Sequence, residues 1–275
     1  MNRLRIIGVC LLALFAVGAT AAASASAETL PEMWECAKAA KEGKVYKGHY
    51  SGKKCEPSTY HPEGGQKYEF QPFTNAKPKT FKGRGGAFNW SIENFSTISC
   101  LKSSDTGHFT GPRTVGHIVI AWTGCETAGL KFENTAKEGE IRTEPLRAEI
   151  GFFDESKGKN VPQEVGIDLR PESGEYLAQY HGGSVPPVLN IRWKGSVIGE
   201  IVPGPKSPYN KFSKELTLNF EEIGGKQAIE KFETGPKDTL VAETCKGCEP
   251  TLPEDNLAWS SEMTGKGEEL YLKAV

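Results

Sequence analysis

The chain has 275 residues, with 33 lysines and arginines, 35 aspartates and glutamates, and a net charge of −2. A nucleic-acid-binding protein needs a basic excess to replace the counterions on phosphates, so this charge balance argues against a nucleic-acid partner. The 31 glycines and 17 prolines indicate many turns. A chain of this length forms one large β domain, or one domain with a small appendage.

The first 27 residues have the features of a secretory signal peptide. Arg3 and Arg5 precede an apolar run from residue 6 to about residue 17, and small residues end at Ala25-Ser26-Ala27. These are a basic n-region, an apolar h-region and an A-x-A cleavage site. The run is shorter than the roughly 20 residues of a membrane span. We therefore expect residues 1–27 to be removed and the mature chain, without a membrane span, to be secreted or held in the cell envelope.

Residues 28–66 form a predicted N-terminal region, and residues 67–275 form a predicted β-rich domain. Pro31 suits the first turn of a helix and Gly43 suits a left-handed stop, so we expect a short helix over 31–42. Helical spacing separates three residues of this stretch, Trp34, Ala37 and Ala40.

From Lys67 onward, short runs of β-branched and aromatic residues alternate with turn residues, without a long amphipathic helix. Runs at spacings of roughly ten to fifteen residues predict a mainly β fold, an antiparallel sandwich or barrel rather than β-α-β units. The sequence does not choose between these two. The runs predicted as strands are 88–92, 115–122, 165–169, 189–201, 216–220 and 270–272.

Six cysteines remain after Cys10 leaves with the signal peptide, and an even number in an exported chain favours disulfides. Many connectivities are open, and we expect local pairing. Cys36 with Cys55, and Cys100 with Cys125, would each close a loop that stabilises the fold by about 3 kcal/mol.

Cys245 and Cys248 have the C-x-x-C spacing of thiol oxidoreductases and of half a zinc site. The surrounding prolines indicate a loop rather than the helix N-terminus that would activate a thiol. A zinc site needs a second pair of ligands, and the sequence offers none with that spacing. We expect a small structural disulfide here.

His108 and His117 form the one candidate metal pair. With Pro112 and Arg113 at the centre of a turn, positions 108 and 117 face each other across a hairpin. Directly opposed residues have Cβ atoms about 5 Å apart, close enough to share a ligand. No third ligand can be named, so we expect two solvent-facing strand residues and no bound metal.

No catalytic residue can be assigned from the sequence. Glu164 and Asp168 share a strand face but lie roughly 13 Å apart, too far for glycoside hydrolysis. The chain has no G-x-S-x-G elbow, H-E-x-x-H motif or phosphate-binding loop, and we expect no cofactor. Other acids that could converge in space are Glu149, Asp154 and Glu200.

One basic and aromatic stretch, residues 73–88, could bind an acidic wall polymer or a sugar face, although a partly packed basic loop is the simpler interpretation. Its basic residues are Lys77, Lys79, Lys82 and Arg84, and its aromatic residues are Phe73, Phe81 and Phe88.

Six motifs together resemble a paralogous family of secreted β-rich proteins of soil actinobacteria. The resemblance covers most of the mature chain and implies fold class and location only. It carries no activity, cofactor or site residue to this chain. The motifs are the P-E-x-W-x-C-x-K-A-A-K start at 31–41 and the segments 81–86, 139–146, 165–169, 195–200 and 265–270.

These observations favour an exported, non-catalytic binding or structural protein of the cell envelope or the extracellular space, with an envelope polymer or a surface protein as partner. The alternative is a secreted hydrolase that acts on polysaccharide or another envelope polymer. A hydrolase requires an acid of strongly perturbed pKa in a deep cleft, and the binding hypothesis does not predict one.

Overall fold

The computed structural model describes residues 30–153, 164–183, 189–202, 209–246 and 255–274. The predicted signal peptide, Asp154 and Cys248 lie outside these residues. In the described part of the chain, no helix is long and apolar enough to cross a membrane. Described residues from Pro31 onward belong to one compact unit.

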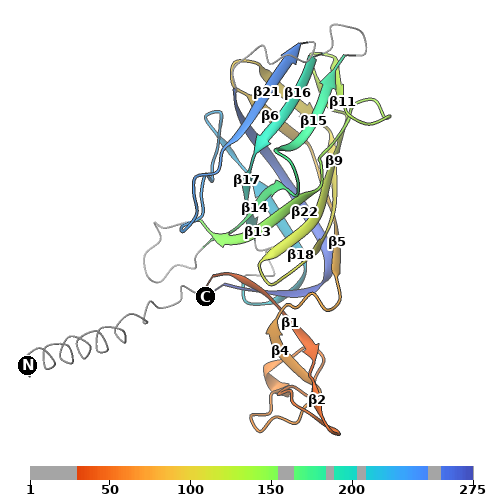
Figure 1. Ribbon diagram of the computed structural model, residues 1–275, viewed down its shortest axis with the longest axis vertical. Coiled ribbons are helices and arrows are strands. Elements are labelled where there is room, and N and C mark those ends of the chain that lie inside the picture. The colour runs from red at the N-terminus through yellow and green to blue at the C-terminus, as the bar shows by residue number, and fades with distance from the viewer. Residues whose placement is uncertain (1–29, 154–163, 184–188, 203–208, 247–254, 275) are drawn as a thin grey trace, which may run out of the picture. The chain divides into compact units, whose positions relative to one another are not determined.

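Eight of the described strands form a closed antiparallel barrel (Figure 1). Each strand pairs with the next, and the last, β22, pairs with β5 to close the circle. The mainly β, antiparallel prediction is therefore confirmed, as a barrel. Around the circle the strands are β5 (Lys79–Gly85), β8 (Lys102–Phe109), β9 (Thr114–Thr123), β13 (Leu146–Phe152), β14 (Val165–Pro171), β17 (Val197–Val202), β18 (Phe212–Phe220) and β22 (Asp255–Lys273).

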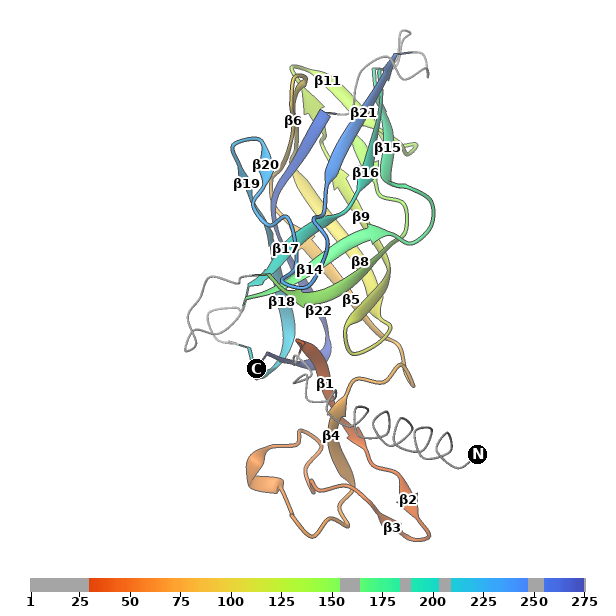
Figure 2. The ribbon, with the colours of Figure 1, turned by 60° about the vertical axis from the view of Figure 1, so that its left-hand side comes forward.

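A second circle of strand pairs also starts and ends at β22, which has 19 residues. The 257–260 half of β22 pairs with β6, whereas the 263–267 half pairs with β5. One strand therefore serves both circles, and Figure 2 shows β22 running from the first set of strands to the second. The other members are β6 (Phe88–Ile92), β7 (Ser96–Cys100), β10 (Glu126–Thr127), β11 (Leu130–Glu133), β15 (Tyr176–Gly182), β16 (Leu189–Gly195) and β21 (Leu240–Lys246).

Four buried tryptophans on β6, β9, β16 and β22 form the centre of the core. Ring centroids lie 4.3 Å apart for Trp90 and Trp193, 4.9 Å for Trp90 and Trp122, and 5.3 Å for Trp122 and Trp259, in edge-to-face geometry. Such pairs contribute about 0.5–1.5 kcal/mol each beyond the area they bury. This cluster fills the space between strands that are far apart in the sequence.

The helix predicted over 31–42 is wrong, because these residues form β1 (Glu32–Lys38) and the short β2 (Lys41–Glu42). β1 pairs with β22 on one side and with β4 (Tyr68–Pro72) on the other. An isolated helix of this length is marginal in water. Strand pairing on both edges, together with burial of Met33, outweighs the helical spacing of the sequence.

Both predicted local disulfides are confirmed. Cys36 in β1 bonds Cys55, with 5.6 Å between the Cα atoms. Cys100 at the end of β7 bonds Cys125, with 4.0 Å between the Cα atoms. β3 (Val45–Tyr46) lies inside the first loop, and a 3-10 turn at Pro57–Thr59 follows it. The predicted bond between Cys245 and Cys248 stays a prediction, because Cys248 lies outside the described residues.

Candidate functional site

The interior of the barrel holds a cavity of about 80 Å³. All eight barrel strands contribute to its lining, and Met33 reaches it from β1. Interior positions of a small barrel are either filled by side chains or enclose a ligand. The apolar lining consists of Met33, Phe81, Phe109, Val115, Ile150, Ile167, Ile201, Leu216, Leu218, Met263, Leu270 and Leu272.

One carboxylate lies within this apolar lining. Asp105 on β8 lines the cavity and is only 7% exposed. Its Oδ1 atom has no hydrogen-bond partner among the described residues. Burial raises the pKa of Asp105 from 3.8 to about 6, because an apolar environment disfavours the charged form. A buried acceptor without a donor costs roughly 1–3 kcal/mol or more, so it marks a position that a ligand could satisfy.

Two glycines of β5 make room for polar side chains of β8. Gly83 pairs with Asp105, and Gly85 pairs with Ser103. A Cβ atom at Gly83 would overlap the Asp105 carboxylate, and one at Gly85 would overlap the Ser103 hydroxyl. The carboxylate therefore extends over the β5 backbone at Gly83, which pairs on its other side with Gly265 of β22.

The β18–β22 ladder has a gap beside the cavity. Ser213 pairs with Leu270 and Glu215 pairs with Lys266, so Lys214 alone faces residues 267–269. Such a bulge disrupts the ladder hydrogen bonds locally. Exposed residues of both signs line the cavity at this gap, which we call the mouth: Lys211, Lys214, Glu215 and Glu268.

A second perturbed acid lies on the other side of the barrel wall. Asp168 follows cavity-lining Ile167 in β14, and successive strand residues face opposite sides. Asp168 accepts a hydrogen bond from Arg170, which also contacts Asp238 at 3.4 Å. Burial, then repulsion from Asp238, raises the pKa of Asp168 to about 7 although Arg170 opposes the shift.

This acid pair leaves no room for a substrate. The Asp168 side chain is 1% exposed and that of Asp238 is 8% exposed. Asp238 also accepts a hydrogen bond from the Ser196 hydroxyl. Phe232, from the segment that leads to Asp238, occupies the space over Gly166 beside them. The pair is thus a covered structural cluster.

The predicted histidine pair does come together, with 4.9 Å between the ring centroids. Its predicted register is wrong by one residue, because His108 pairs with Gly116. His117, in a left-handed conformation with φ of 47°, forms a bulge that brings its ring back to His108. Nδ1 of His117 lies 2.9 Å from the Glu172 carboxylate. Among the described residues, no three His, Cys, Asp or Glu side chains form a group that could hold a metal ion.

The stretch at 73–88 exposes its basic residues Lys77, Lys82 and Arg84 but not its aromatic rings. Phe73 and Phe88 are buried, and Phe81 lines the cavity. Nζ of Lys79 lies 3.2 Å from the carboxylate of Glu35. The aromatic rings thus face the core.

The carboxylates considered in the sequence do not form a dyad in the cavity. Glu149 is exposed and pairs with Asp168 across β13 and β14. Glu200 of β17 pairs with Gly166 of β14, and Glu164 lies just before β14. None of these three lines the cavity.

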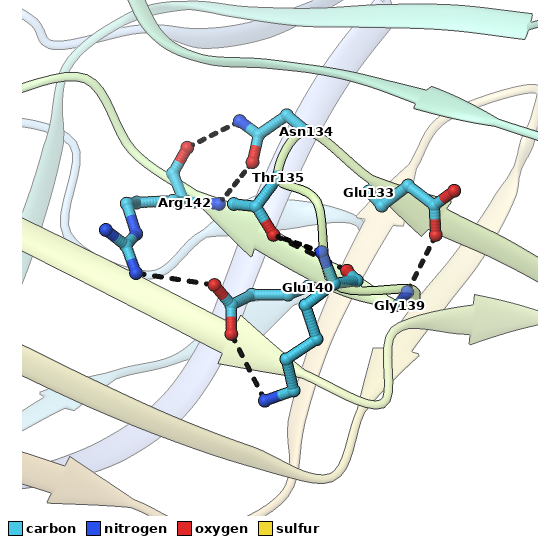
Figure 3. A network of polar contacts seen from close by, with 7 residues as sticks. Glu133, Asn134, Thr135, Gly139, Glu140 and Arg142 are labelled. Carbon is cyan, nitrogen blue, oxygen red and sulfur yellow. Dashed lines mark hydrogen bonds and ion pairs between the residues drawn. The ribbon is translucent and has the colours of Figure 1, made fainter.

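Polar contacts hold together the segment that connects β11 to β12 (Glu140–Arg142), as Figure 3 shows. Asn134 donates to the carbonyl of Arg142 at 2.7 Å and accepts from its amide at 2.8 Å. Glu133 accepts from the Gly139 amide at 2.8 Å, and Glu140 binds Arg142 at 3.3 Å. These groups satisfy one another, so the network positions the hairpin.

Comparisons with known proteins find no matching family, no matching curated protein and no matching solved structure. The functional assignment therefore depends on the geometry of the barrel.

Sequence reasoning missed Asp105. A signal was nevertheless present, since Ser103, Asp105, Gly107 and Phe109 occupy alternate positions and share one strand face. Three of these four residues are polar or small, which is the composition expected of a strand face exposed to solvent. Only the pairing of β8 with Gly83 and Gly85 shows that this face points inward.

Proposed function

We propose that the protein is an exported, non-catalytic binding protein whose barrel holds a small, mainly apolar ligand. The observation that carries this proposal is the apolar cavity with one unpartnered carboxylate in its wall. An apolar cavity of about 150 Å³ can take up benzene, so one of about 80 Å³ accommodates roughly three or four non-hydrogen atoms. The mouth between β18 and β22 allows a longer ligand to extend outward.

The hydrolase alternative has less support. Asp105 is an acid of perturbed pKa in a cavity, a feature that the binding hypothesis did not predict. Glycoside hydrolysis needs a second carboxyl group about 5–9.5 Å away, on the other side of the scissile bond. The other aspartate of raised pKa, Asp168, faces away from the cavity and is covered. A single acid fits ligand recognition better than acid-base catalysis.

Export is part of the proposal. It is supported by the signal-like first 27 residues and by two disulfides, which persist in oxidising compartments. Mass spectrometry of protein recovered outside the cytoplasm of its native host should find Glu28 at the mature N-terminus. A soluble product that retains residues 1–27 would contradict export.

The cavity can be tested with xenon, an apolar probe that binds in dry protein cavities. A crystal under xenon pressure should show one xenon atom inside the barrel. Gly265→Leu should abolish this site, because a Cβ at Gly265 would lie 3.8 Å from the Phe81 ring and a longer side chain would fill the cavity. Gly86→Leu makes the same chemical change at an exposed position with no atom within 4 Å and serves as the control.

Thermal unfolding of both variants should stay cooperative, which separates cavity filling from misfolding. Xenon that is absent from the wild-type barrel, or that binds equally well in Gly265→Leu, would contradict the proposed function.

A further inference from the structure

We propose that the ligand carries a primary ammonium group, and that Asp105 binds this group inside the barrel. This inference rests on the proposed function and specifies the chemistry of the ligand. The geometric basis is a buried carboxylate oxygen, Oδ1 of Asp105, without a protein donor in the described part of the chain, at the wall of a cavity that is otherwise mostly apolar.

The first step concerns charge. Burial raises the pKa of Asp105. The lysines that line the cavity, Lys211 and Lys214, are exposed residues at the mouth, where Glu215 and Glu268 also lie. The carboxylate is already desolvated in the folded protein, so a cationic ligand has to lose only its own hydration. An anionic group would be repelled.

The second step concerns which donor fits. With a pKa of about 6, Asp105 is mostly ionised at neutral pH. An ammonium group offers three N–H donors together with a positive charge, whereas a hydroxyl group offers one donor and no charge. Charge-assisted hydrogen bonds are roughly twice as strong as neutral ones. The site should therefore prefer an amine to an alcohol of the same length.

The third step concerns the path of the ligand. Gly83 pairs with both Asp105 and Gly265, so the carboxylate and the Gly265 backbone lie on either side of one β5 residue. Two residues beyond Gly265, Gly267 lines the cavity at the mouth. A head group at Asp105 places a short alkyl chain over Gly265, beside Phe81, and directs its end toward the mouth.

The test compares n-butylamine with 1-butanol by isothermal titration calorimetry at pH 7.5. Wild-type protein should bind the amine at least about tenfold more tightly than the alcohol, the lower end of what a charged hydrogen bond provides. Asp105→Asn should reduce this preference to about twofold or less while retaining xenon in the cavity. Glu262→Gln, which removes one exposed acid from the outer face of β22, should leave the preference unchanged within about twofold.

The preference should also fall as the pH drops below about 6, because protonation of Asp105 removes its charge. The other groups that line the cavity and titrate are Tyr209, Lys211, Lys214, Glu215 and Glu268.

Each outcome distinguishes the two proposals. Amine and alcohol affinities that are alike in the wild type, or an unchanged preference in Asp105→Asn, would overturn the ammonium assignment while xenon binding keeps the proposed function. Loss of both amine and xenon binding in the wild type would overturn both.

Discussion

Replacing Asp168 by asparagine is expected to stabilise the protein at pH 8 by as much as about 4 kcal/mol. Its pKa is raised from 3.8 to about 7, first by burial and then by Asp238. A raised pKa means that the environment as a whole favours the neutral form, although the bond from Arg170 favours the charged form. One pKa unit corresponds to about 1.4 kcal/mol. A neutral side chain of the same shape avoids the cost of ionising Asp168 at pH 8.

The sign of the pH dependence follows from the same shift. Between about pH 8 and pH 4, folded Asp168 takes up a proton that the unfolded chain does not, so this contribution to stability rises as the pH falls. Wild-type protein should therefore gain stability from pH 8 to pH 5, and Asp168→Asn should show a flatter profile.

Urea unfolding at pH 8 and pH 5 measures both effects. Glu262→Gln removes an exposed acid that is not among the groups that shift the pKa of Asp168, and it should change stability by less than about 0.5 kcal/mol. If Asp168→Asn destabilises the protein at pH 8, the ion pair with Arg170 outweighs burial and the assigned direction is wrong.

Local sequence signals predicted individual strands better than the closure of these strands into a barrel. The alternating residues 88–92 correspond to β6, and the β-branched run 115–122 lies within β9. Closure depends on β22 pairing with β5, nearly 190 residues earlier in the chain, as in the bond from Lys79 to the Glu269 carbonyl, which spans 190 residues. No local pattern encodes such a pairing, so the sequence could not distinguish a sandwich from a barrel.

The errors have a common physical origin in tertiary contacts that override local preferences. The 31–42 segment has helical spacing, yet it becomes β1 because β4 and β22 both offer free strand edges. The hairpin register is displaced because His117 adopts a left-handed conformation and inserts a bulge. Local propensity gives neither the partner strand nor the bulge.

The candidate site was the least predictable part of the molecule. Asp105 is one of four residues in a polar stretch, Lys102 to Asp105, that suggests an exposed strand. Its burial results from closure of the barrel and from the missing side chain at Gly83. The segment that carries Phe232 and Asp238 covers Asp168, and this cover is a tertiary feature without a local signal.

Replacing Asp105 by asparagine is expected to stabilise the ligand-free protein at pH 8 by as much as about 3 kcal/mol, on the scale of about 1.4 kcal/mol for one pKa unit. Its pKa is raised from 3.8 to about 6 by burial, so the ionised carboxylate opposes folding above about pH 6. Below about pH 4 the acid is neutral in both states, and the gain should disappear. Ionised Asp105 then destabilises the ligand-free fold but favours ligand binding, as expected where function at a site reduces stability.

Urea unfolding of the wild type and Asp105→Asn at pH 8 and pH 3.5, with and without n-butylamine, separates these two roles. The gain at pH 8 should shrink when the amine saturates the wild type, because a ligand that binds only the folded state stabilises it. Glu262→Gln should show neither the gain nor its loss. If Asp105→Asn is no more stable than the wild type at pH 8 without ligand, a protein group or a bound water already satisfies Oδ1. The barrel would then lack the unmet charge from which the ligand chemistry is inferred.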